Sequence, residues 1–389
     1  MELTLTLSKH QVYLLTNDFT EYSHRTGEIR IFPWEGGTKI IFYKRDMGIQ
    51  WYITPMGKYG DNHYILIVKI NPKILGGEID YITASTNSDM GCAIVNFNKI
   101  STEISPLLQN FNCYTIRRID YCINFFIDEL APECTTEQIM YLIKHSNIPP
   151  FYDEWQTYSD KEHRMKSNPN SFYLINRFSV INCYLKYKEM LERFIENQKK
   201  GYPPIPLEAL EKSKYVIRFE VQCMRRKVYV LLKNAEKNGF YGADRYKYLV
   251  SPIVCEEIIT QYFLETVGGG DWFTLSDAIK QVYSHNFNQQ KRERLVKALQ
   301  VVNKCRSVSK AKELYQDKEL EYFKRTLKYL SSLGINPVTI PQSWGIQKIP
   351  NLLDNFFNQL PLSFWDKDSQ CHKYSPLDYR TIKNNLNIL

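Results

Sequence analysis

The hydrophobic and polar positions of the first 130 residues follow the patterns of β-strands more than those of helices. Short runs rich in β-branched and aromatic residues are separated by Gly-rich or Asn/Asp-rich breaks, which predicts strands over 28–32, 38–44, 50–54 and 64–70. A further strand is expected over 172–184, broken into a hairpin near Asn176, and another over 215–223. The first two thirds of the chain are therefore expected to be rich in strands.

Helical periodicity takes over from about residue 251. Apolar residues at helical spacing predict helices over 276–283, 289–303 and 318–333. This change of texture predicts two domains, residues 1–248 and residues 249–389, with a boundary between 245 and 252.

Within the first domain, two helices and one loop are expected. Thr135 and Gln138 have the spacing of a capping box, which predicts a helix over 136–145. The segment 187–199 is a second helix, ended by the glycine and prolines that follow. The polar segment 153–170 is predicted to be a loop.

The net charge of +8 is unevenly distributed along the 389 residues. Residues 1–160 carry 13 basic and 19 acidic side chains, whereas residues 161–250 carry 19 and 9. A local basic surplus is what binding to a polyanion requires, because neutralised phosphates release counterions. A solvated helix face would give the same count, so charge alone leaves both readings open.

Cysteine usage and hydropathy exclude several classes of protein. The nine cysteines contain no Cys-x-x-Cys spacing, which argues against a zinc knuckle or a disulfide framework and favours a reducing compartment. No stretch reaches 18 apolar residues, and the N-terminal residues lack the pattern of a secretory leader. The chain is expected to be cytoplasmic, in a host cell, with no membrane partner.

Two predicted strands carry charged residues on what should be their polar faces. A period of two puts one set of polar side chains on one face of each strand: Arg118, Asp120 and Asn124 in the first, and Arg218, Glu220 and Gln222 in the second. A structural explanation is a cross-strand ion pair, Arg118 with Glu220 or Arg218 with Asp120. The alternative is a site for chemistry.

A third element adds a tyrosine to these carboxylates. The strand predicted to end at Tyr184 is followed by Lys186, Lys188 and, one helical turn later, Glu189. A phenol titrates near 10, so attack on a phosphate needs a base or nearby positive charge. Oxygen ligands suit magnesium or manganese, and three carboxylates are candidates for one such ion: Asp120, Glu189 and Glu220. The chain has 28 tyrosines, however, and most must be packing residues.

At these residues the chain resembles the gene II replication-initiator family of filamentous phages, which has related members on plasmids. The resemblance rests on the order and spacing of four short motifs: Asn71-Pro72-Lys73-Ile74-Leu75-Gly76-Gly77, Arg118-Ile119-Asp120, Tyr184-Leu185-Lys186 with Glu189, and Arg218-Phe219-Glu220. It spans roughly residues 60–345. One departure is that Val68 and Lys69 stand where some members carry an acid, which leaves Glu189 as the expected third metal ligand.

The resemblance implies an α+β fold, with an antiparallel-sheet nuclease palm followed by a mainly helical C-terminal domain. It implies rolling-circle replication, in which Tyr184 nicks one strand of a double-stranded origin, stays attached as a 5′-phosphotyrosine and later rejoins the strand, with Mg²⁺ or Mn²⁺ as cofactor. Lys186 and Tyr187 are expected to assist catalysis, Tyr187 being the second candidate nucleophile. The host helicase and polymerase are the expected partners, and a homodimer at the origin is compatible with this role.

DNA contacts are expected in two places. Near the tyrosine, Arg118, Arg218 and Lys188 could hold phosphates, and Trp155 or Tyr173 could stack on unpaired bases. In the C-terminal domain, the basic segment around residues 289–312 is expected to grip the duplex origin through Lys291, Arg292, Arg294 and Lys297. The alternatives are a noncatalytic sequence-specific DNA-binding protein, a magnesium-dependent hydrolytic nuclease or a relaxase of a mobile element.

Overall fold

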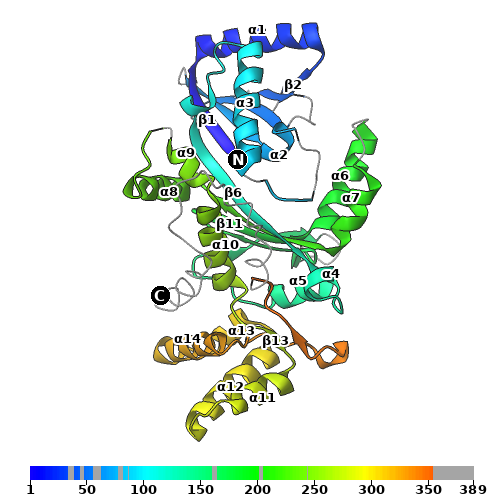
Figure 1. Cartoon of the computed structure of the whole chain (residues 1–389), viewed down its shortest axis with the longest axis vertical. Helices are drawn as coiled ribbons and strands as arrows, with labels where there is room; N and C mark the ends of the chain where they lie inside the picture. The colour runs from blue at the N-terminus through cyan, green and yellow to red at the C-terminus, as the bar shows by residue number, and fades with distance from the viewer. Residues whose placement is uncertain are drawn as a thin grey trace.

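A computed structural model describes residues 1–33, 39–43, 48–55, 63–77, 82–85, 87–159, 164–200, 205–242 and 244–353. Its strands form one ten-stranded sheet and two small two-stranded sheets, with helices packed around them (Figure 1). The fold is therefore of the expected α+β class. Within the described ranges no helix has the length and apolar character needed to cross a membrane. Residues 354–389, the last part of the expected C-terminal domain, lie outside the described residues.

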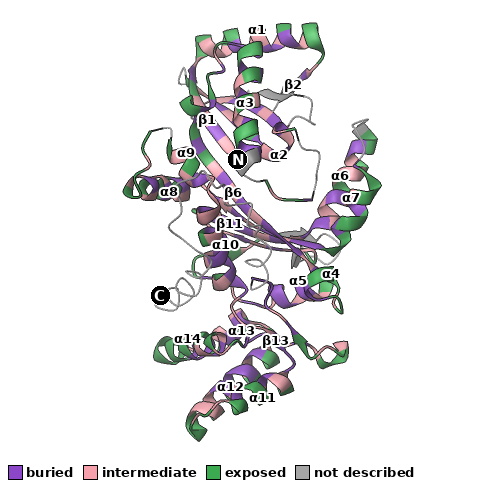
Figure 2. Ribbon diagram, in the orientation of Figure 1, coloured by how far each residue is buried: buried purple, intermediate pink, exposed green. Residues whose placement is uncertain are grey.

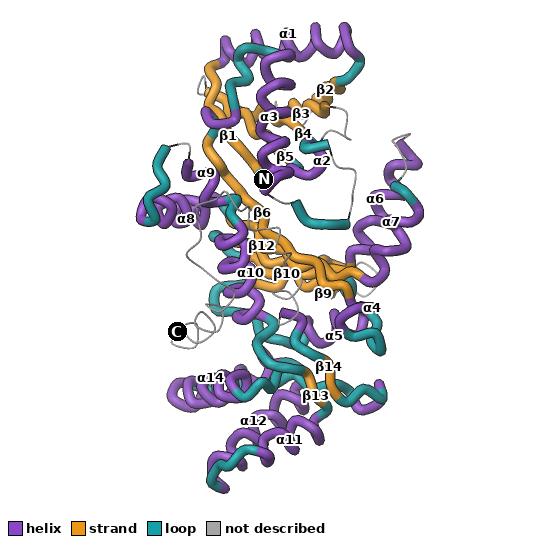
Figure 3. The backbone as a smooth tube through the Cα atoms, viewed as in Figure 1, coloured by secondary structure: helices purple, strands orange, loops and turns teal. Residues whose placement is uncertain are grey.

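Every strand pairing in the large sheet is antiparallel. The strand order is β2 (Ile29–Pro33), β3 (Lys39–Tyr43), β4 (Ile49–Pro55), β5 (His63–Ile70), β1 (Glu2–Ser8), β6 (Thr115–Phe126), β12 (Val216–Cys223), β11 (Ser179–Leu185), β10 (Ser171–Ile175) and β7 (Asp153–Glu154). The 12-residue strand β6 pairs with β1 on one side and β12 on the other. It thereby joins an N-terminal half-sheet to a second half-sheet, as the strands of Figure 3 show.

The N-terminal half-sheet is covered by helices that the strand-like texture of this region did not predict. They are α1 (Lys9–Thr26), α2 (Pro72–Leu75) and α3 (Asn87–Ile104). Helix α1 begins at a capping box of Ser8 and Gln11 and buries Leu15, Phe19 and Tyr22 along one face. Its remaining positions are mostly polar, so the narrow apolar stripe was missed. A strand-rich interpretation of the first 130 residues was therefore incomplete.

The second half-sheet buries its apolar face under helices that lie close in sequence to its strands. The helices of this region are α4 (Ile127–Leu130), α5 (Thr136–Lys144), α6 (Lys186–Lys200), α7 (Leu207–Lys212), α8 (Arg225–Lys237), α9 (Asp244–Leu249) and α10 (Pro252–Thr266). The ring of Phe263 on α10 packs edge-on against Phe125 of β6 and Phe219 of β12. In Figure 2 the buried residues run along the strands, while the outer sides of the helices are exposed.

The C-terminal unit is a group of helices closed by a short strand pair. Its elements are β13 (Trp272–Phe273), α11 (Leu275–Ser284), α12 (Gln289–Cys305), α13 (Val308–Lys312), α14 (Asp317–Ser332) and β14 (Lys348–Ile349). The three helices predicted in this region are confirmed within one or two residues. Helix α10, which the predicted boundary assigns to this unit, packs on the large sheet.

Within the first domain the predicted hairpin, the strand near residue 220 and both helices are confirmed. Thr135 and Gln138 do form the capping box of α5. The loop predicted over 153–170 was wrong in part, because it contains β7 and the paired strands β8 (Gln156–Ser159) and β9 (Arg164–Ser167). These two strands pair through their backbones and have little apolar alternation in their sequences, so the pattern of side chains gave no signal for them.

Candidate nucleic-acid nicking site

The register of β11, β12 and β6 gathers the predicted residues on one face of the second half-sheet. Tyr184 lies opposite Arg218, and Arg218 lies opposite Asn124. The next row on the same face contains Asn182, Glu220 and Cys122. Because directly paired residues in an antiparallel sheet point to the same side, these rows form one polar surface on the face opposite α5 and α10.

Asp120 lies one row beyond, opposite Gln222 of β12. Its carboxylate accepts from Nε and Nη2 of Arg118 at 2.8 and 3.0 Å, and Nη1 of Arg118 lies 3.1 Å from Glu2 Oε1 on β1. The expected alternative of a cross-strand pair between Arg118 and Glu220 was therefore wrong. Glu2 was missed because nothing local to it indicates that β1 pairs with β6.

Arg218 is oriented by groups from distant parts of the chain. Its Nε donates to Asn124 Oδ1 at 2.8 Å and its Nη2 donates to the carbonyl oxygen of Ile82 at 2.6 Å. The expected pairing of Arg218 with Asp120 is thus replaced by neutral acceptors. A guanidinium that lies opposite Tyr184 and that, among the described residues, donates its hydrogen bonds only to neutral acceptors keeps most of its charge available for an anionic ligand.

Tyr184 is the penultimate residue of β11, as expected, but its hydroxyl is not activated by its surroundings alone. Burial raises its pKa well above the usual 10, and the carboxylates of Glu220 and Glu189 act in the same direction. The positive charge of Arg218 lowers the pKa of Tyr184, but by less than burial and the two carboxylates raise it. The phenol is therefore protonated at neutral pH, and any attack by its oxygen needs a partner that removes the proton.

Lys186 follows Tyr184 by two residues and is the first residue of α6. Its side chain is only 5% exposed, and Nζ donates to Glu189 Oε2 at 2.6 Å. Burial, together with the positive charge of Arg218, lowers its pKa to about 8. An amine with this pKa is partly neutral near physiological pH and can accept a proton.

The third predicted metal ligand, Glu189, has both carboxylate oxygens in ion pairs. Oε2 binds Lys186, and Oε1 lies 2.7 Å from Nη2 of Arg193. Burial opposes its ionisation, but the two cations prevail and lower its pKa below the ordinary value. An ion held by Glu189 would have to displace these cations.

Glu220 and Asp120 are the other candidate pair for a cation, and an ion held by Asp120 would likewise have to displace Arg118 and the N-terminal ammonium, which lies 3.5 Å from Oδ2. Burial raises the pKa of Glu220, and the negative charge of Asp120 raises it further. Oε1 of Glu220 accepts from Gln222 Nε2 at 2.8 Å. A carboxylate whose pKa is raised by a neighbouring carboxylate gains from a divalent cation beside it.

A further candidate oxygen on this face was missed from the sequence. Oδ1 of Asn182, directly opposite Glu220, is buried and has no hydrogen-bond partner among the described residues. Within the described ranges, no set of three His, Cys, Asp or Glu side chains is arranged to hold a metal. Two carboxylates and an amide oxygen suit Mg²⁺ or Mn²⁺. The sequence did contain a signal for Asn182, because it lies two residues before Tyr184 in a strand and such residues share a face.

Tyr187 and Lys188 follow on α6. Tyr187 is half-buried against a small cluster that includes Met190 and Val216, and its ring lies within 6 Å of two amines, Lys188 at 5.8 Å and Lys214 at 5.6 Å. These contacts give Tyr187 a packing role.

The basic residues predicted to grip the duplex lie on α12 and are mostly engaged by aromatic rings. Lys291 donates to the hydroxyl of Tyr329, Arg294 donates to that of Tyr322 at 3.0 Å, and Arg292 stacks over Tyr283. Lys297 is exposed. Of the four, Lys297 is therefore the most available for a phosphate contact.

The unit that carries α12 is attached on the far side of the sheet from Tyr184. The backbone N–H of Val308 donates to the carbonyl oxygen of His145 at 3.0 Å, and that of Ile148 donates to Ser309 Oγ at 2.8 Å. His145 ends α5, which covers the apolar face of β10 and β11 (Figure 1). The polar surface around Tyr184 and helix α12 are thus separated by the thickness of the sheet and its covering helices.

Among the solved structures that resemble this chain are two distant ones. The rolling circle replication initiator protein from Geobacillus stearothermophilus is 10% identical, with a TM-score of 0.30 over 68% of this chain and 83% of that chain. The di-domain ARO/CYC StfQ from the steffimycin biosynthetic pathway is 9% identical, with a TM-score of 0.20 over 68% of this chain and 97% of that chain. No protein-family model and no curated protein matches the sequence. Likenesses this weak do not show a function.

Proposed function

We propose that the protein is a rolling-circle replication-initiator endonuclease that nicks one DNA strand with Tyr184 and forms a 5′-phosphotyrosine. The observation that carries the proposal is the row of Tyr184 and Arg218, with the carboxylates of Asp120 and Glu220 on the same face and the buried Lys186 two residues beyond Tyr184 in the chain. A nucleophile, a cation for the phosphate and a proton acceptor are the parts that phosphoryl transfer to a tyrosine requires.

In the proposed reaction, neutral Lys186 accepts the phenolic proton as the oxygen of Tyr184 bonds to the scissile phosphorus. The bond between phosphorus and the 3′-oxygen breaks, and that oxygen takes a proton from solvent to give a 3′-hydroxyl. Arg218 stabilises the negative charge on the nonbridging oxygens. A magnesium ion held by Asp120, Glu220 and Asn182 would supply further neutralisation of that charge. The reverse attack by a 3′-hydroxyl joins strands without an outside energy source.

Unpaired bases need a surface near the scissile phosphate. Tyr173 of β10 lies opposite Asn182, in the row that contains Glu220. The side chain of Trp155 is 58% exposed, and its ring lies 6.4 Å from that of Tyr173 at a steep angle. We infer that this pair stacks on bases of the locally melted strand.

The role of Lys186 predicts a pH dependence. Below a pKa of about 8 the amine is protonated and cannot accept the phenolic proton. The single-turnover nicking rate is therefore expected to rise about tenfold per pH unit up to pH 8 and to level off above it. Lys186→Arg, which stays protonated, should lower the rate by about 100-fold and remove this inflection. An unchanged inflection in the variant would assign the proton transfer to another group.

The decisive experiment for the proposed function uses the full chain, magnesium and a labelled pool of single-stranded oligonucleotides of random internal sequence. We expect a protein–DNA adduct that survives denaturation, with sequences around the nick enriched in the adduct. Nicked DNA without an adduct would instead indicate a hydrolytic nuclease. Retention of DNA without any nick, in magnesium or manganese, would indicate a noncatalytic DNA-binding protein.

Duplex binding by the C-terminal unit is the second part of the proposal, with Lys297 as its most accessible cation among those expected. Since α12 and Tyr184 lie on opposite sides of the sheet, one short DNA segment cannot contact both. We infer that the initiator holds a duplex segment and a melted strand at separate surfaces. The host helicase, the polymerase and a homodimer at the origin belong to this proposal as partners.

A further inference from the structure

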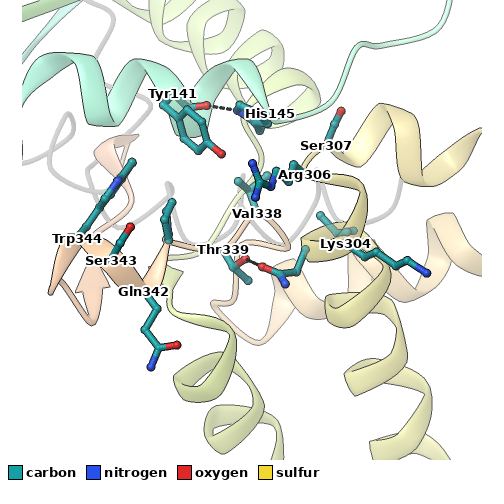
Figure 4. Close-up of a pocket in the computed structure, with 13 residues that line it drawn as sticks. Tyr141, His145, Lys304, Arg306, Ser307, Val338, Thr339, Gln342, Ser343 and Trp344 are labelled. Carbon is teal, nitrogen blue, oxygen red and sulfur yellow. Dashed lines mark hydrogen bonds between the residues drawn. The ribbon is translucent and has the colours of Figure 1, made fainter.

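A second candidate site lies where the C-terminal unit meets α5, away from the polar surface around Tyr184. A cavity of about 670 Å³ opens between the end of α5, the turn after α12 and the segment 338–344. Figure 4 shows side chains from these three segments around it. The volume is in the range of pockets that hold a small ligand or one nucleotide.

One side of the cavity is aromatic. The ring centroid of Tyr141 lies 4.0 Å from that of His145 and 5.5 Å from that of Trp344. Nδ1 of His145 donates to the carbonyl oxygen of Tyr141 at 2.6 Å, which fixes the imidazole ring. Tyr141 and Trp344 are half-buried, so each keeps part of its surface exposed. An apolar planar group has a surface to stack on here.

The other side is cationic. Lys304 and Arg306 line the cavity, and no acidic side chain is among the described residues that line it. Burial lowers the pKa of His145, and the positive charges of Lys310, Lys144 and Arg306 lower it further. A cavity with this potential favours an anion.

Arg306 occupies a backbone conformation that side chains disfavour. Its φ and ψ are 49° and 30°, the left-handed conformation that usually belongs to glycine at the end of a helix. In Figure 4 its guanidinium lies between His145 and Val338. The chain therefore keeps an arginine at the cavity wall where glycine would be the less strained choice.

We propose that this cavity binds one unpaired nucleotide, with its base against Trp344 and Tyr141 and its phosphate at Arg306 and Lys304. The combination of stacking rings and cations without carboxylates is the chemistry by which proteins hold single-stranded nucleic acid. The site does not depend on the nicking reaction at Tyr184, because the sheet separates the two. A strand held here would contact both α5 and the C-terminal unit.

The test uses the full chain and two probes, thymidine monophosphate and a thymidine oligonucleotide carrying one 5-bromouracil. Irradiation of the bound oligonucleotide, followed by peptide mapping, is expected to place a crosslink in the peptide that contains Tyr141 or Trp344. Titration with the monophosphate shows whether a free nucleotide also binds. Competition between the two probes shows whether the cavity prefers a free nucleotide or a nucleotide within a strand.

Variants at two positions test the cavity without disturbing the fold. Arg306→Gly removes the guanidinium and relieves the backbone strain, so it should be at least as stable as the parent while losing about tenfold in affinity for whichever probe binds. Trp344→Leu should lose a similar factor and Trp344→Phe should retain stacking. Lys237→Ala, which removes an exposed amine from α8, is the control and should change neither crosslinking nor affinity.

Crosslinks to the cavity that disappear in Arg306→Gly and Trp344→Leu support the proposal. Crosslinks found only outside these segments, or full cavity binding in both variants, overturn it. Since adduct formation at Tyr184 is measured separately, loss of one activity with retention of the other distinguishes failure of this inference from failure of the proposed function.

Discussion

Tyr184→Phe is expected to abolish the covalent adduct and the nick while leaving the fold and DNA binding intact. The change removes one hydroxyl and keeps the ring, so a tyrosine that only packs should lose about 0.5–1.5 kcal/mol of unfolding free energy at most and keep activity. If the hydroxyl is the nucleophile, phenylalanine has no atom that can replace it, and the reaction stops. The measurement is a denaturing gel of labelled single strand with the variant, beside thermal unfolding and a binding titration.

Tyr187→Phe is the matched control for this prediction. Tyr187 begins the same helical turn as Glu189 but is half-buried against the Met190 and Val216 cluster, and its ring contacts lysines. The variant should retain the first cleavage. An adduct that persists in Tyr184→Phe and vanishes in Tyr187→Phe would move the nucleophile to α6, and adducts in both variants would make the element structural.

Glu220→Gln is expected to lower nicking by at least about 100-fold and yet to make the folded protein more stable at neutral pH. Burial and the charge of Asp120 raise the pKa of Glu220 above its unfolded value. A carboxyl with a raised folded pKa destabilises the fold once pH exceeds the unfolded pKa, and the penalty is absent at lower pH, where both states are protonated. The uncharged amide of glutamine does not carry this cost of ionisation, so the folded state is stabilised at neutral pH.

The gain should therefore be visible as a higher denaturant midpoint at pH 7 and should shrink towards pH 4. Opposite changes in activity and stability mark a charge that is kept for function, whereas a structural carboxylate would lose both. Glu103→Gln, which removes an exposed carboxylate from α3, should alter neither. Nicking that survives in Glu220→Gln with unchanged magnesium dependence would exclude this carboxylate as a ligand.

Local sequence patterns determined the elements that present the site. Period-two alternation in β6 and β12 put Arg118, Asp120, Arg218 and Glu220 on polar faces, since successive side chains of a strand point to opposite sides. Caps and helical spacing located α5, α6, α12 and α14. The helix α1 was missed because its apolar stripe is narrow, and β8 and β9 because their pairing depends on backbone groups.

Only the tertiary structure decided which of these faces meet and what each charged group binds. Pairing of β1 with β6 brings Glu2 to Arg118, and pairing of β11 with β12 sets the unpartnered oxygen of Asn182 opposite Glu220. The attachment of α12 on the far side of the sheet is equally nonlocal, whereas the ion pairs of Glu189 with Lys186 and Arg193 join neighbours on one helix. A residue's own neighbours in sequence fix its periodicity, but strand order and helix docking depend on contacts between distant segments, which no local pattern encodes.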